Sequence, residues 1–175
     1  YSGDRALPVS VFTLDWEGAP LRLSVFDPRD ERVAVKTSVA GRVMERLSDA
    51  LGESCSAAVL DGSDIVYVMR VHTHKIVSLN LNVGTRLPAY CTSLGRVLLA
   101  GLDDAEVKNR LGSSSLSAKT RHTVTDPAEV LARVQQVRRQ GWALVNQELE
   151  EGLVSAAAPV KNRAGKVVAA LNASW

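Results

Sequence analysis

The residues in this chain that could do chemistry gather in one stretch, Leu87-Pro88-Ala89-Tyr90-Cys91-Thr92-Ser93-Leu94-Gly95-Arg96-Val97-Leu98-Leu99-Ala100. Pro88 disfavours helix in the residue before it, Thr92 is a good N-cap, and the apolar residues after Gly95 recur with helical spacing. A helix should therefore begin near Ser93. Its first backbone N–H groups have no partner within the helix and lie at the positive end of the helix dipole, so they can bind a small carboxylate without a charged side chain. Spacing alone leaves open the commoner alternative, an ordinary capped helix that enters a core.

The sequence offers little for catalysis. The Gly-x-Ser-x-Gly pattern of serine hydrolases is absent, and each of the three histidines lies in a polar, loop-like segment. Cys91 and His122 could pair as a thiol and a base, but nothing in the sequence brings them together. His72 and His74 alternate beside Lys75 with no carboxylate or cysteine close by, which indicates a solvated turn and not a metal site. There is also no Walker motif and no glycine-rich dinucleotide loop. We therefore expect no catalytic residue, no cofactor and no metal, with an enzyme of unknown type as one remaining alternative.

Length and composition indicate one large domain with a real core, since the chain has 175 residues and 46% apolar content. No apolar run approaches the roughly 20 residues of a membrane-spanning helix, and no signal peptide begins at Tyr1. We therefore expect a soluble, cytoplasmic protein with no membrane partner. Cys55 and Cys91 are expected to be buried free thiols. The net charge of +2 and the lack of a basic run interleaved with aromatic residues argue against DNA binding by this chain alone.

Periodicity predicts an α+β fold with about six strands, helices on both sides and a cavity between them. Helices are predicted over 35–51, from about 93, over 103–111 and over 127–140; strands over 55–60, 65–71, 76–81, 142–145, 153–160 and 166–175. Residues 8–12 and 21–25 alternate around Glu17-Gly18, which fits either a pair of strands or a poorly ordered extension. The serine-rich segment 112–123 fits either a lid over a pocket or a surface connector.

Small side chains occupy the predicted strand 153–160, in the run Ser155-Ala156-Ala157-Ala158. Small residues on a strand leave room above the sheet, where a cavity can open. Asn172 and Ser174 are two residues apart and therefore share one face of the last strand. That polar face is turned either to solvent or to a polar pocket.

Three segments carry a family resemblance. They are the stretch 87–100, then Gly141-Trp142-Ala143-Leu144-Val145-Asn146-Gln147-Glu148-Leu149-Glu150-Glu151-Gly152-Leu153, then Ala157-Ala158-Pro159-Val160. In this order and spacing they resemble the effector-binding domain of IclR-type bacterial transcription regulators, from about Val35 to Ser174. The resemblance implies a GAF-like fold with a six-stranded antiparallel sheet over residues 33–175. Residues 1–32 remain an unassigned extension or linker remnant. The family's winged-helix domain and its last helix are expected to be absent from this chain.

The resemblance also implies a site. The family's effector carboxylate rests on backbone amides that fall at Ser93 and Leu94, and its pocket side chains fall at Val145, Ser155, Asn172 and Ser174. Val145 departs from the aspartate, and Ser155 from the cysteine, of the glyoxylate-responsive branch. An apolar residue in place of an acid argues against a very small, highly polar effector.

The residues of the first two segments most resemble those of regulators of protocatechuate, 4-hydroxybenzoate and β-ketoadipate catabolism. This resemblance implies an aromatic or dicarboxylic acid effector. The resulting expectation is a sensing and self-associating domain of a transcription regulator. It would form a homodimer or homotetramer and contact DNA only through an attached winged-helix domain. The alternative from another class is a structural dimerisation module that binds no ligand.

Overall fold

The computed structural model describes residues 11–16, 19–24, 39–72 and 81–175. In chain order the elements are β1 (Val11–Trp16), β2 (Ala19–Ser24), α1 (Val39–Leu51), β3 (Ser54–Asp61), β4 (Asp64–Val71), β5 (Arg86–Pro88), α2 (Ser93–Ala100), α3 (Asp104–Gly112), α4 (Pro127–Gln140), β6 (Ala143–Asn146), β7 (Val154–Lys161) and β8 (Val167–Ser174). None of the helices in these ranges combines the length and apolar character needed to cross a bilayer.

Six of the strands form one antiparallel sheet in the order β5-β4-β3-β8-β7-β6. Two hairpins, with turns at Asp61-Gly62-Ser63-Asp64 and Asn162-Arg163-Ala164-Gly165, join β3 to β4 and β7 to β8. Strand β8, the last in the chain, therefore lies in the middle of the sheet between β3 and β7. The predicted six-stranded antiparallel α+β architecture is confirmed.

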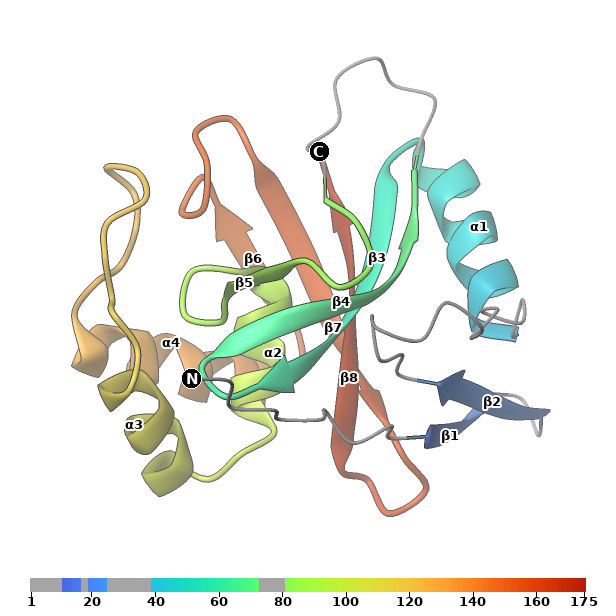
Figure 1. The fold of residues 1–175 in the computed structure, drawn as a ribbon, viewed down its shortest axis with the longest axis horizontal. Helices are drawn as coiled ribbons and strands as arrows, with labels where there is room; N and C mark the ends of the chain where they lie inside the picture. Colours follow the sequence, from blue (N-terminus) through green and yellow to red (C-terminus); the bar gives the residue numbers. More distant parts are fainter. Residues whose placement is uncertain (1–10, 17–18, 25–38, 73–80) are drawn as a thin grey trace, which may run out of the picture.

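Helices cover both faces of this sheet (Figure 1). Helix α1 packs against β3 and β4 on one face, and α2 packs on the other face with α4 and α3 behind it. The larger core lies between α2, α3, α4 and the sheet and includes Tyr90, Leu94, Val130 and Ala157. The smaller core lies under α1 and includes Met44 with both Val68 and Met69 of β4.

Helix α2 begins where the sequence predicts because its first turn is built locally. Thr92 has extended backbone angles, and its hydroxyl oxygen accepts a hydrogen bond from the Gly95 N–H at 3.2 Å. A Cβ at Gly95 would overlap the Ala89 backbone. Glycine therefore allows the extended chain before α2 to lie directly against the helix, which fixes where the helix start points.

Several boundaries differ from the predictions. Of the two alternatives for the first tract, the structure forms the pair of strands, with β1 antiparallel to β2. The predicted strand residues 8–10 and 25 lie outside the described residues, as do helix residues 35–38 and most of the predicted strand 76–81. Leu81, its last residue, is not in a strand. Strand β5 was missed because three residues ending in proline carry no alternation, and it exists through pairing with β4.

Segment 112–123 and the end of α4 are tied to the rest of the fold by hydrogen bonds. Segment 112–123 is held at Ser117, whose carbonyl accepts from the Tyr90 hydroxyl at 2.5 Å, and at Thr123, whose hydroxyl donates to the Glu148 carbonyl at 2.6 Å. Arg138 on α4 is exposed, and its guanidinium also donates to the carbonyls of Ala100 and Leu102 at 3.1 and 2.7 Å, because helix ends leave carbonyls without partners.

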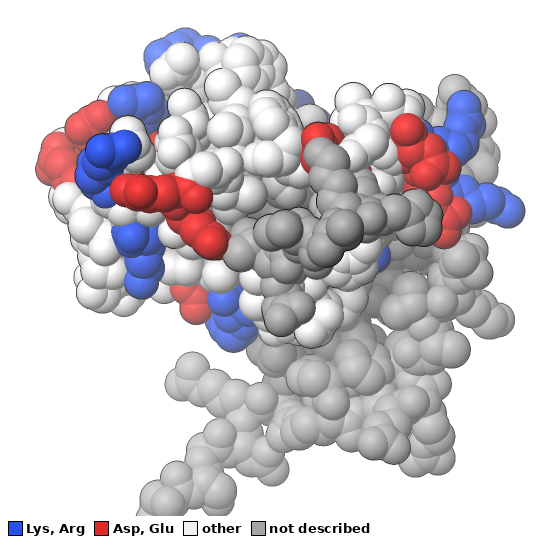
Figure 2. Space-filling model, turned by 90° about the horizontal axis from the view of Figure 1, so that it is seen from above, with Lys and Arg blue, Asp and Glu red and all other residues white. Residues whose placement is uncertain are grey.

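Charged side chains on the outer helices are mostly paired. On α3 and α4, Arg110 with Glu106 and Arg133 with Glu129 form ion pairs one helical turn apart, at 2.8 and 3.1 Å. Figure 2 shows basic and acidic side chains interspersed at the left and right ends of the face in view. This pattern is typical of a solvated surface.

Candidate functional site

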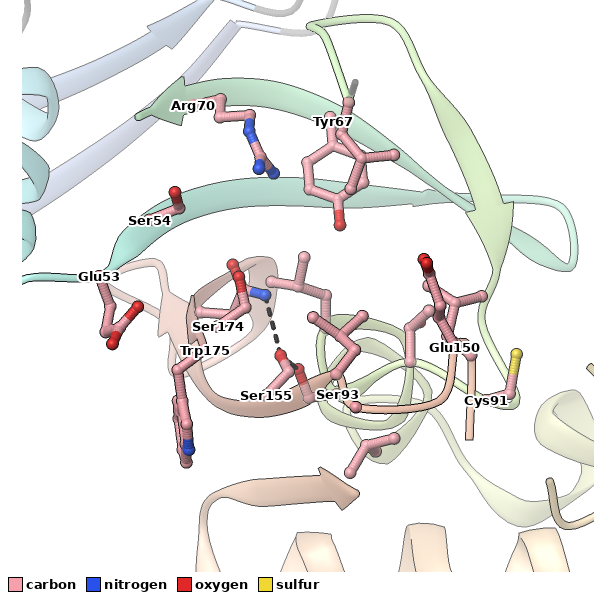
Figure 3. Close-up of a pocket in the computed structure, with 18 of the residues that line it drawn as sticks. Glu53, Ser54, Tyr67, Arg70, Cys91, Ser93, Glu150, Ser155, Ser174 and Trp175 are labelled. Atoms are coloured by element: carbon pink, nitrogen blue, oxygen red, sulfur yellow. Dashed lines mark hydrogen bonds between the residues drawn. The ribbon is translucent and has the colours of Figure 1, made fainter. Parts of the chain in front are cut away.

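A cavity of about 320 Å³ lies between the start of α2 and the sheet (Figure 3). Its lining comes from the sheet, the α2 start, the chain segment after β6 and the C-terminal residue: Glu53, Ser54, Tyr67, Arg70, Leu81, Cys91, Thr92, Ser93, Leu94, Val145, Leu149, Glu150, Glu151, Gly152, Leu153, Ser155, Asn172, Ser174 and Trp175. The volume is within the usual range of about 300–1,000 Å³ for small-molecule sites.

All six residues predicted from the sequence lie in this lining. Ser93 and Leu94 open α2, and the other four come from three sheet strands: Val145 from β6, Ser155 from β7, Asn172 and Ser174 from β8. Asn172 and Ser174 thus face the cavity and not bulk solvent, which decides the alternative that spacing left open.

The start of α2 presents free hydrogen-bond donors to the cavity. Ser93 and Leu94 are only 2% and 1% exposed. Because Thr92 takes the N–H of Gly95, the backbone N–H groups of Ser93 and Leu94 are the ones left over, and neither has an acceptor among the described residues. Burying two backbone N–H groups without a hydrogen-bond acceptor costs free energy. They can be satisfied by a ligand or by water within the cavity.

A chain of hydrogen bonds fixes the polar floor of the cavity. The Ser93 and Ser155 hydroxyl oxygens lie 2.5 Å apart, and the Asn172 side-chain amide donates to the Ser155 oxygen at 3.0 Å. The side-chain oxygen of Asn172, Oδ1, accepts a hydrogen bond from the Ser56 backbone N–H at 3.1 Å, which orients the side-chain amide. The α2 start is therefore held at a fixed position above β7 and β8.

Two lining residues that the sequence analysis missed, Tyr67 and Arg70, come from β4. Strict alternation puts residues three apart on opposite faces of a strand. In β4 the pairing changes from Ala57 with Met69 to Ala58 with Tyr67, so Val68 is an extra residue in a β-bulge. The bulge restores Tyr67 and Arg70 to one face, and Figure 3 shows both directed into the cavity.

Burial shapes the charge of these two side chains. Desolvation raises the pKa of Tyr67, which therefore stays neutral and able to donate a hydrogen bond. Desolvation also lowers the pKa of Arg70, an effect opposed by the neighbouring Tyr67, but a guanidinium stays protonated at neutral pH. The Arg70 guanidinium donates to the Ser56 hydroxyl at 3.2 Å and more weakly to His72 Nδ1 at 3.4 Å.

A buried ion pair secures the wall formed by residues 149–153. The Arg96 guanidinium on α2 meets the Glu148 carboxylate in two hydrogen bonds of 2.7 and 2.6 Å, and their side chains are 2% and 8% exposed. Arg96 also donates to the Tyr90 carbonyl at 3.2 Å, and Glu148 accepts from the Val124 N–H at 3.3 Å. The pair joins the helix that offers the free N–H groups to the segment that closes the cavity.

Cys91 and His122 do not form a thiol–base catalytic pair in the structure. Cys55 and Cys91 are both buried and free, as predicted. Burial raises the pKa of the Cys91 thiol to about 11, so it stays protonated and is a poor nucleophile at neutral pH. His122 is exposed, and its Nε2 accepts from Arg121 at 3.1 Å. Within the described ranges no group of three His, Cys, Asp or Glu side chains could hold a metal ion.

The family resemblance is confirmed by comparison with known proteins. Residues 32–175 match the family described as bacterial transcriptional regulator IclR, C-terminal. The Pca regulon regulatory protein of Pseudomonas putida is 49% identical over 132 residues, which cover 75% of this chain and 45% of that protein. The chain spans about half the length of the curated relatives it matches.

Solved structures match the fold closely. A double mutant of the inducer-binding domain of the transcription factor PobR from Acinetobacter, in complex with 3-hydroxybenzoic acid, has a TM-score of 0.72 and 32% identity, covering 78% of each chain. An IclR homologue from Microbacterium hydrocarbonoxydans, in complex with 4-hydroxybenzoate, has a TM-score of 0.70 and 29% identity, covering 81% of this chain and 61% of that one. Both relatives are thus bound to small aromatic acids.

Proposed function

The chain belongs to the IclR family of bacterial transcriptional regulators, and on this basis we propose that its cavity binds a small organic acid as the effector of a transcription regulator. The carboxylate of the acid accepts hydrogen bonds from the backbone N–H groups of Ser93 and Leu94. The body of the acid lies over Val145, Ser155, Asn172 and Ser174. No bond to the protein needs to form or break, so the site acts as a sensor and not as an enzyme.

One observation carries this proposal: Ser93 and Leu94, buried at the start of α2, line the cavity, and their backbone N–H groups have no acceptor among the described residues. A helix N-terminus favours an anion both through these donors and through the helix dipole. Since the cavity wall also includes apolar side chains, such as Leu94, Val145 and Leu149, an acid with an apolar body fits better than a bare anion.

Aromatic or dicarboxylic acids are the proposed chemical class. The two structural relatives bound to hydroxybenzoates support an aromatic acid, and the relative that regulates a Pca regulon supports control of aromatic catabolism. Val145 supports an effector larger than a very small, strongly hydrated acid, because its apolar side chain offers such an acid no hydrogen-bond partner in the cavity.

Signal transfer follows from the position of the acid between α2 and the sheet. An effector that binds one arrangement of these elements more tightly than another shifts the population between them. We propose that this shift passes to a winged-helix domain joined to the chain, within a homodimer or homotetramer that contacts DNA through those domains. Sedimentation with and without the acid measures the assembly.

Isothermal titration calorimetry tests the binding step. The panel consists of 3-hydroxybenzoate, 4-hydroxybenzoate, protocatechuate and adipate, with 4-hydroxybenzamide as an uncharged match for 4-hydroxybenzoate. We expect at least one acid to bind with a stoichiometry of one per chain and the amide to bind far more weakly. Failure of every acid in the panel, or equal binding of the amide, would contradict the proposal.

The alternative of a structural module without a ligand makes a different prediction for the same region. Such a module would have a filled core at Ser155, Ala157 and Asn172. Ala157 does pack in the larger core, whereas Ser155 and Asn172 line the open cavity, which favours the sensor.

A further inference from the structure

A second group of hydrogen-bond donors lies in the cavity, on the sheet. Arg70 and Tyr67 reach it from β4, which is a different element from the helix that offers the Ser93 and Leu94 N–H groups. In Figure 3 the Arg70 guanidinium and the Tyr67 hydroxyl point from β4 into the cavity that Ser93 and Ser155 also line. The cavity therefore has donors on two walls.

The charge of Arg70 is not neutralised within the described part of the protein. Its hydrogen bonds go to two neutral acceptors, the Ser56 hydroxyl and His72 Nδ1, and no carboxylate lies in ion-pair range of it there. The Tyr67 hydroxyl likewise has no hydrogen-bond partner among the described side chains. A half-buried cation that has no counter-ion among the described residues favours binding of an anion, because folding has already removed part of the water around its charge.

The acidic residues of the lining do not take this role. Of the three acidic residues in the lining, Glu150 and Glu151 are exposed, so water and salt screen their charge, and Glu53 is half-buried and already takes part in an interaction of its own. Arg70 is more buried than Glu150 and Glu151, and burial lowers its pKa, an effect that the neighbouring Tyr67 opposes. The part of the cavity beside Arg70 is therefore more favourable to anions than the part beside Glu150 and Glu151.

We propose that Arg70, with the Tyr67 hydroxyl, binds a second acid group of the effector, so that the preferred effector is a dicarboxylate. One carboxylate lies on the Ser93 and Leu94 N–H groups and the other on the Arg70 guanidinium. This inference rests on the proposed function, because it assigns the second end of a ligand whose first end lies at α2. A planar guanidinium matches a carboxylate in two parallel hydrogen bonds, which makes arginine the suitable residue type.

The test compares acids that differ only in the second acid group. Succinate, glutarate, adipate and pimelate are titrated against the unsubstituted chain by calorimetry, each beside the monoacid of the same length: butyrate, valerate, hexanoate and heptanoate. We expect at least one diacid to bind about tenfold or more tightly than its monoacid. In Arg70→Met that advantage disappears while the monoacid affinity stays within about twofold, and Arg70→Lys retains part of it.

The possible results separate failure of the dicarboxylate inference from failure of the proposed function. If the hydroxybenzoates bind but no diacid exceeds its monoacid, or if Arg70→Met weakens both acids equally, the dicarboxylate inference is wrong and the proposed function stands. If none of the acids binds, both fail. The comparison on the unsubstituted chain needs no variant, so it remains decisive even where Arg70→Met does not fold. Arg133→Met on the exposed face of α4 is the matched control and should change neither affinity.

Discussion

Replacement of Ser93 by proline removes one of the two donors proposed to bind the effector and leaves the helix in place. Proline is favoured at the first position of a helix, where its missing N–H is not needed. The preceding residue, Thr92, already has φ −119° and ψ 146°, which is the extended conformation that a following proline requires. The Ser93 N–H has no acceptor among the described residues, so its removal costs no protein hydrogen bond.

The magnitude follows from the contact that is lost. A hydrogen bond to a charged group contributes about 1.5–3 kcal/mol, which corresponds to roughly 10- to 150-fold in the dissociation constant. Ser93→Pro also removes the hydroxyl that meets Ser155, and Ser93→Ala removes that hydroxyl alone. The effect of the N–H is therefore the difference between the two variants. Stability should fall by no more in Ser93→Pro than in Ser93→Ala, since proline at a compatible position restricts the unfolded chain.

Calorimetry with the acid that binds the unsubstituted chain most tightly measures this difference, and urea unfolding of both variants checks the fold. We expect Ser93→Pro to bind at least about tenfold more weakly than Ser93→Ala at similar stability. Equal affinities in two folded variants would refute the reasoning, because the Ser93 N–H would then not contact the effector.

Three further predictions follow from the same structure. Ser155→Leu fills the cavity and should abolish acid binding in calorimetry, whereas Ala158→Leu on the exposed face of the same strand should leave it unchanged. Glu148→Gln leaves the buried charge of Arg96 without a counter-ion and should lower the free energy of unfolding by about 3–5 kcal/mol in urea titrations; a loss below about 1 kcal/mol would be typical of a surface pair instead. An unfolded thiol ionises near pH 9, and burial raises the pKa of Cys91 to about 11. The unfolded chain therefore binds fewer protons between these values, and stability should fall as the pH rises through that window, by roughly 2–3 kcal/mol relative to Cys91→Ala; identical pH profiles for the two proteins would contradict this.

Locally coded features were predicted well. Thr92, the predicted N-cap, accepts a hydrogen bond from the first turn of α2. The helices predicted from 103 and 127 begin at Asp104 and Pro127, because Asp103 and Asp126 serve as their N-caps. Gly141 ends α4 with a φ of 86°, in the left-handed region that glycine tolerates. These signals work because the hydrogen bonds that start and stop a helix join residues within a few positions of each other.

The candidate site was predicted in part. Ser93 and Leu94 follow from the cap itself, and the positions of Val145, Ser155, Asn172 and Ser174 came from the family resemblance. Arg70 was missed because its face depends on the bulge at Val68, and the ion pair of Arg96 with Glu148 was missed because 52 positions separate the partners.

The sequence by itself determined where α2 begins, which backbone N–H groups are left free there, and which strands are lined with small side chains. Only the tertiary structure decided that Ser93 and Leu94 line a cavity and that Arg70 lies in its wall. The physical reason is range: a cap is satisfied by atoms one turn away, whereas strand register, the bulge at Val68 and the space above Ser155 arise only when β3, β4, β7, β8 and α2 pack together.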